Sequence, residues 1–117
     1  MTPFGAKLRL LRAERGIQLK AMAAWLGVSA AYLSALEHGH RGRPSSGLVQ
    51  QISAYFNLAW DDVDELKRLA ELSHPRVVVD TAGLSPRATE LANRLAEVIG
   101  ELDEAAIERV LAELGER

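Results

Sequence analysis

The sequence contains no cysteine, few aromatic residues and no long apolar run. Without cysteine there is no disulfide framework of the kind that stabilises small secreted proteins. No stretch approaches the ~20 apolar residues that a membrane span needs, and the first residues lack a signal-peptide profile, so we expect a cytoplasmic protein with no membrane partner. A length of 117 residues fits one domain, or one small domain with an extension, and excludes a transporter or a large catalytic barrel.

Catalytic and metal-binding patterns are also missing. No nucleophile–base pair and no phosphate-cradling glycine-rich loop is recognisable, so we do not expect an enzyme. His38, His40 and His74 do not predict a metal site, because no cysteine or matched carboxylate accompanies them. The carboxylates between residues 61 and 65 lack the glycine and the spacing of a calcium-binding EF-hand. We therefore expect no metal and no cofactor.

Charge is divided unevenly between the two halves of the chain. Residues 1–47 carry seven basic and two acidic side chains, a net charge of +5, whereas residues 48–117 carry seven basic and 14 acidic side chains, a net charge of −7. A basic half joined to an acidic half indicates a polyanionic partner for the first half only.

The apolar spacing predicts an all-α first domain over residues 1–73 with five helices. Glycine, serine and asparagine residues mark where these helices begin and end. The expected helices cover residues 4–14, 19–26 and 30–37, a fourth from a cap at Ser45 or Ser46 to Phe56, and a fifth with Asp61 and Asp62 in its first turn.

The remaining residues, 74–117, predict a C-terminal extension of one short strand and two helices. The β-branched run at 76–80 predicts the strand. Ser85 and Pro86 form a strong helix start, and Asp103 is placed to cap a final helix. The first of the two helices is expected to carry a regular apolar seam: Leu84, Ala88, Leu91, Leu95, Val98 and Leu102.

Two short helices joined by Gly27, Val28 and Ser29 are the candidate functional element. Such a pair needs a small residue where the helices cross, which Ala23 supplies, and a turn residue free to take positive φ, which Gly27 supplies. The second helix then presents its N-terminus outward, where the backbone amides favour phosphate.

The stretch from Leu8 to Leu58 resembles the lambda-repressor-like helix-turn-helix domain, in particular the Xre-type family of bacterial and phage regulators. The resemblance implies a five-helix DNA-binding domain that binds duplex DNA sequence-specifically, usually as a homodimer on a dyad-symmetric operator. The residues that carry it are Leu8, Leu11, Arg12, Gly16, Ile17, Met22, Ala23, Leu26, Gly27, Val28, Ser29, Tyr32, Leu33, Ser34, Leu36, Glu37, Gly39, Arg41, Pro44 and Ser45.

The resemblance also places the DNA-contacting residues. On the second helix Tyr32 is the only large polar group among them, and the others are small. Alanines offer thymine methyl contacts but no bidentate hydrogen bonds, so specificity is expected to depend on the loop arginines and on DNA shape. Gln18 is a poorer helix cap than the family favours, and Leu19 cannot donate to a phosphate. The expected contacts are Gln18, Lys20, Ser29, Ala30, Ala31, Tyr32, Ser34, Ala35, His40, Arg41 and Arg43.

Two further interactions are expected. The resemblance implies that Arg12 and Glu37 pair inside the domain rather than being solvated separately. A lone strand leaves its backbone groups without hydrogen-bond partners, and a single apolar seam leaves its leucines exposed to water. A second copy of the chain would cover both. The alternative is that the extension folds back on its own domain. The expected dimer interface comprises Val77, Val78, Val79, Leu84, Ala88, Leu91, Leu95, Val98 and Leu102.

The sequence favours a transcriptional regulator, most often a repressor, that acts as a homodimer on double-stranded DNA. An antitoxin of a toxin–antitoxin pair is the alternative, in which the same domain binds DNA and the extension binds a partner protein. A third reading is a protein- or RNA-binding adaptor that has lost DNA readout, which the small residues of the second helix keep open.

Overall fold

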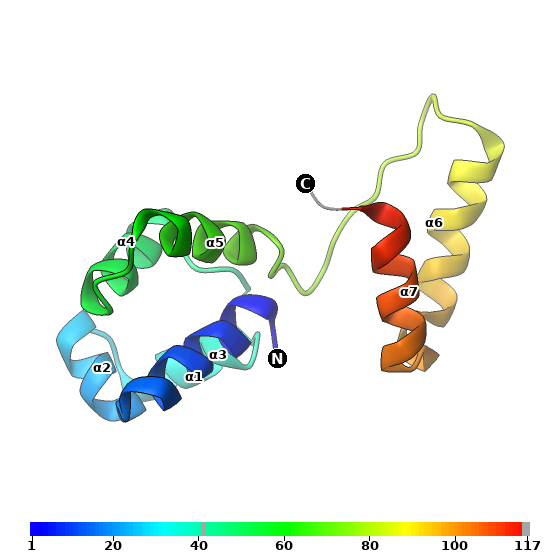
Figure 1. Ribbon diagram of the computed structural model, residues 1–117. Helices are drawn as coiled ribbons and strands as arrows, with labels where there is room; N and C mark the ends of the chain where they lie inside the picture. Colours follow the sequence, from blue (N-terminus) through cyan, green and yellow to red (C-terminus); the bar gives the residue numbers. More distant parts are fainter. Residues whose placement is uncertain (41, 116–117) are drawn as a thin grey trace. The chain divides into compact units, whose positions relative to one another are not determined.

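A computed structural model describes residues 1–40 and 42–115 (Figure 1). The described residues form helices and connections, and the chain divides into two compact units, Met1–Val77 and Val78–Arg117. The predicted all-α class is therefore confirmed.

The first unit contains the five helices that the apolar spacing predicts. Hydroxyl side chains begin three of them: Thr2 accepts a hydrogen bond from the Gly5 amide at 3.0 Å, and Ser29 and Ser45 do the same for α3 and α4. The helices are α1 (Pro3–Arg15), α2 (Leu19–Leu26), α3 (Ala30–Glu37), α4 (Ser46–Tyr55) and α5 (Trp60–Glu71).

The core of this unit draws side chains from all five helices. α1 packs against α3 and α5, α2 packs against α3 and α4, and α4 packs against α5. This arrangement encloses the apolar faces that the helical periodicity predicts. The largest fully buried apolar side chains are Phe4, Leu8, Met22, Leu33, Leu36, Ile52 and Leu66.

The second unit consists of α6 (Pro86–Val98), the short 3₁₀ segment η1 (Ile99–Glu101) and α7 (Glu104–Leu114). Ser85 caps α6 and Asp103 caps α7 through side-chain hydrogen bonds, as their positions in the sequence predict. None of these three segments contains a buried residue. The helix caps of this unit therefore lie where the sequence predicts them, but its helices form no buried core of their own.

Two expectations for the extension are wrong. The described part of the chain contains no strand, and Val77, Val78 and Val79 lie outside any helix with 73%, 94% and 66% of their surface exposed. β-Branched residues favour extended backbone, but a strand requires a partner for its hydrogen bonds, and residues 1–40 and 42–115 supply none.

The apolar seam also does not continue through one helix. α6 ends at Val98, so Leu84 and Leu102 lie outside it. Gly100 lowers the helix propensity at this point, and Asp103 begins a new helix just beyond it.

Among the described residues, no single helix is long and apolar enough to span a membrane. α2 and α3 together would qualify by length and composition alone, but they are bent by 111°. Their apolar side chains are those of the core, including Met22, Leu26, Leu33 and Leu36.

Candidate nucleic-acid interface

The connection between α2 and α3 determines how α3 is presented. Gly27 ends α2 with φ 73°, a left-handed conformation that its missing side chain permits. The amide of Val28 then bonds to the Ala23 carbonyl at 3.0 Å, and Ser29 caps α3. The resulting bend of 111° between the two helices lies within the range of about 90–120° that is typical of helix-turn-helix pairs.

The first turn of α3 is open to solvent. Ser29, Ala30 and Ala31 are exposed, whereas Leu33 and Leu36, one and two turns further along the chain, are buried in the core. The buried leucines hold the helix in the domain, so its N-terminal residues project from a rigid support.

The rest of α3 contributes less exposed surface than the sequence indicates. Tyr32 is half-buried and its side chain packs against the edge of the core, and Ser34 and Ala35 are also half-buried. His38 donates from Nδ1 to the Ser34 carbonyl oxygen at 2.8 Å, a second bond to a carbonyl that already accepts from the His38 amide at 3.1 Å. The surface available for base contacts is therefore concentrated in the first turn.

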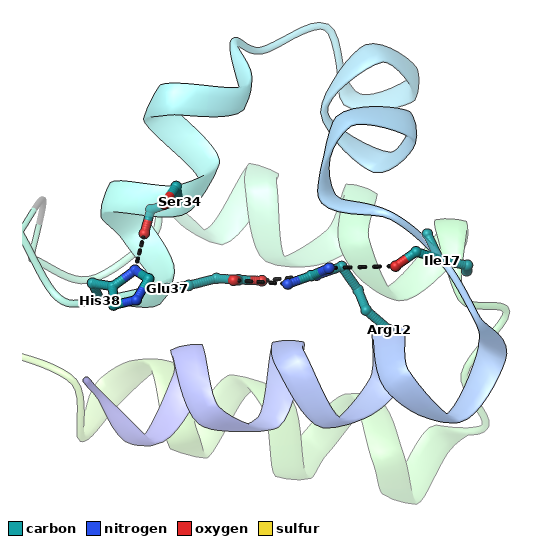
Figure 2. Close-up of polar contacts among 5 residues, drawn as sticks. All are labelled: Arg12, Ile17, Ser34, Glu37 and His38. Atoms are coloured by element: carbon teal, nitrogen blue, oxygen red, sulfur yellow. Dashed lines mark hydrogen bonds and ion pairs between the residues drawn. The ribbon is translucent and has the colours of Figure 1, made fainter.

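An ion pair inside the domain anchors the other end of α3. Arg12 donates from Nε to Glu37 Oε2 and from Nη2 to Glu37 Oε1, both at 3.0 Å, and its Nη1 donates to the Ile17 carbonyl oxygen at 3.3 Å (Figure 2). The Glu37 side chain is 2% exposed and that of Arg12 is 16% exposed. One arginine thus joins α1, the loop after α1 and the last turn of α3, and its paired bonds satisfy a buried carboxylate.

Two residues that support this region were not singled out from the sequence. A Cβ on Gly5 would lie 1.9 Å from the Glu37 carbonyl oxygen, so only glycine allows α1 to pass this close to the end of α3. The Ser73 hydroxyl accepts from the Phe4 amide at 3.0 Å and donates to the Leu69 carbonyl at 2.6 Å, which ties α1 to the end of α5. The available signal for Gly5 was a glycine inside an amphipathic helix. No local pattern indicates the role of Ser73.

Four of the residues expected to contact DNA outside α3 are exposed. Gln18 and Lys20 are exposed at the start of α2, and His40 and Arg43 are exposed in the loop between α3 and α4. Gln18 makes no capping hydrogen bond. Arg41 lies outside the described residues.

The described residues include no group of three or more histidine, aspartate or glutamate side chains that could hold a metal ion. The features of the site are instead a small exposed first turn, cationic flanking segments and a buried anchor. A short helix pair joined by a left-handed glycine, with the second helix so presented, defines a helix-turn-helix domain.

Comparison with known proteins assigns the family. The model described as "Helix-turn-helix domain" matches residues 3–66, more than half of the chain, and the chain belongs to this family. The resemblance to helix-turn-helix regulators that the sequence predicts is therefore confirmed. The extension lies outside the matched residues.

Two curated proteins of Bacillus subtilis (strain 168) are similar to this chain. One is named "Uncharacterized HTH-type transcriptional regulator RghRB" and is 32% identical over 63 residues, which cover 54% of this chain and 45% of the relative. The other is named "HTH-type transcriptional repressor RghR" and is 34% identical over 61 residues, covering 52% and 45%. The matched part thus spans just under half the length of each relative, and no solved structure matches significantly.

Proposed function

We propose that this protein is a transcriptional regulator that binds double-stranded DNA through the first turn of α3. The observation that carries the proposal is the exposed, capped start of α3 on a helix that Leu33 and Leu36 anchor in the core. Backbone amides at such a helix start favour phosphate, and small side chains let the helix approach the bases closely. Family membership and the printed names of both relatives support the same function.

The charge distribution supports a nucleic-acid partner for the first unit. Residues 1–47 carry a net charge of +5. Lys20 and Arg43 are exposed and form no ion pair within the described part of the chain. Cations presented in this way attract the phosphate backbone and position the recognition helix without reading sequence.

We further propose that the protein is a repressor that acts as a homodimer on a dyad-symmetric operator, with residues 1–73 as the DNA-binding domain and 74–117 as the dimerisation extension. Exposed apolar residues in the extension support this assembly, because a helix pair with no buried residue gains stability when a second copy covers it. The proposed interface includes the exposed Leu91 and Val98 and the half-buried Leu95 of α6, together with Ala88, Leu84, Leu102 and Val77–Val79.

Ala31→Glu tests the recognition surface. A carboxylate in the first turn of a helix is stabilised by the helix dipole, so the fold should be retained. The same negative charge is repelled by the phosphates that line the groove, so specific binding should be abolished. Ala105→Glu is the matched control, because Ala105 is also exposed at the second position of a helix, α7. DNA selected from a random pool by the wild-type protein serves as the probe in an anisotropy titration. Normal binding by Ala31→Glu would show that the recognition surface lies elsewhere.

The solution mass tests the assembly. We expect a dimer at micromolar concentration for the full chain and a monomer for the Leu91→Glu/Val98→Glu variant, since two carboxylates would then have to be buried at the interface. A monomeric wild-type chain would contradict the homodimer and favour the alternative in which the extension binds a different protein.

A further inference from the structure

A hollow of about 410 Å³ opens in the first unit between the start of α4 and the end of α5. Its lining includes Arg43 from the loop after α3, Ser46 and Gln50 from α4, and Lys67 and Glu71 from α5. The hollow therefore begins at a residue already expected to meet DNA and extends onto a helix for which the sequence predicts no DNA contact.

The charge in this hollow is not neutralised within the described residues. Glu71 is engaged by Arg68, whose Nη1 lies 3.1 Å from Glu71 Oε2. Arg43 and Lys67 are exposed and have no ion-pair partner among the residues that the structure describes. Two cations, together with the Gln50 amide and the Ser46 hydroxyl, thus present hydrogen-bond donors along one surface.

We propose that Lys67 contacts a phosphate of the bound duplex, so that the DNA backbone passes from Arg43 along this hollow to α5. The inference rests on the proposed function, since it extends the surface that binds DNA. Phosphate is the ligand because it accepts hydrogen bonds from lysine, amide and hydroxyl donors alike and carries the charge that two free cations attract. The duplex is its source because the lining includes Arg43, which is already expected to contact DNA, and because all four donors are exposed at the surface.

Lys67→Gln measures the contact, and Lys7→Gln is the matched control. Lys7 carries the same charge in the same unit, but it pairs with Glu65 at 3.5 Å and does not line the hollow. We expect Lys67→Gln to reduce the slope of log K against log salt by about 0.9, which is about an eightfold loss of affinity at 0.1 M salt relative to 1 M. The loss should be equal on selected and unrelated DNA, and the melting temperature should not change. Lys7→Gln should leave the slope unchanged.

Glu71→Gln is an independent test, because this substitution should change DNA affinity in the opposite direction to Lys67→Gln. Removing the carboxylate from the hollow should raise DNA affinity about two- to fivefold, the range of a surface charge interaction. If Lys67 only stabilised the fold, as a cation near the C-terminal end of α5, Lys67→Gln would lower the melting temperature and leave the salt slope unchanged.

The outcomes separate this proposal from the proposed function. A wild-type protein that does not bind duplex DNA would overturn both. A wild-type protein that binds as expected, with an unchanged slope for Lys67→Gln, would overturn the Lys67 contact alone. Binding of inorganic phosphate that depends equally on Lys67 in the absence of DNA would assign the hollow to a free anion and also overturn it.

Discussion

α1 and α6 are both 13-residue helices, and both begin with proline after a hydroxyl cap, Thr2 and Ser85. α1 buries Phe4, Leu8 and Leu11, whereas α6 buries no residue at all. Equal local signals therefore produce equal helices but unequal packing. What differs is the presence of neighbours: α1 packs against α3 and α5, which close over it. Local signals place both helices, but a short helix gains most of its stability from packing, and only α1 obtains that packing from a core within its own unit.

The largest expected effect breaks the packing of the first unit through its backbone. Gly5→Ala should cost more than about 3 kcal/mol, above the usual range for overpacking, because the added methyl group meets a backbone carbonyl that cannot rotate away. Gly47→Ala in α4 is the control: nothing lies within 4 Å of its Cβ, so alanine should stabilise by about 0.5–1 kcal/mol. Urea denaturation measures both, and similar values for the two variants would contradict the close approach of α1 to α3.

The next effect compares one ion pair from each unit. Arg12→Ala should cost about 3 kcal/mol, because it leaves the buried Glu37 carboxylate without its partner. Arg87→Ala should cost ~0–1 kcal/mol, since Arg87 is 87% exposed although it lies 2.7 Å from Glu90. Thermal unfolding of both variants checks the difference.

The Arg12→Ala/Glu37→Ala double variant extends this test, and it should be more stable than the sum of the two single effects predicts. Strict additivity would show that the two residues do not interact.

The smallest effect sharpens the comparison between the apolar side chains of the two units. Leu33→Ala should cost about 2–3 kcal/mol, because Leu33 is 0% exposed, whereas Leu91→Ala should change the stability of an isolated chain by less than about 0.5 kcal/mol, because Leu91 is 64% exposed. Repeating the Leu91→Ala measurement over a range of protein concentrations separates the chain from its assembly. A cost for Leu91→Ala that grows with concentration is expected if a second copy covers α6, and a constant cost near zero would argue against that interface.

The sequence predicted most of the first unit because its signals are local and mutually consistent. Ser29 and Ser45 cap α3 and α4 as their spacing predicts, and Gly16 and Gly27 end α1 and α2 in left-handed conformations. The prediction failed in the extension, where the valine run is not paired and α6 stops before Leu102. A valine run indicates backbone preference but not the presence of a partner strand, and an apolar seam does not show that a glycine will interrupt it.

By itself, the sequence determined where the helices begin and end in Met1–Val77, which of their faces are apolar, and the separation of a basic half from an acidic half. Tertiary structure alone decided that Gly5 lies against the Glu37 carbonyl, that Ser73 bonds to the Phe4 amide across 69 residues of sequence, and that Lys67 shares a hollow with Arg43. The physical reason is the range of the forces involved. Caps, propensity and periodicity act within a few residues, whereas close approach, long-range hydrogen bonds and shared surfaces depend on which segments the folded core brings together.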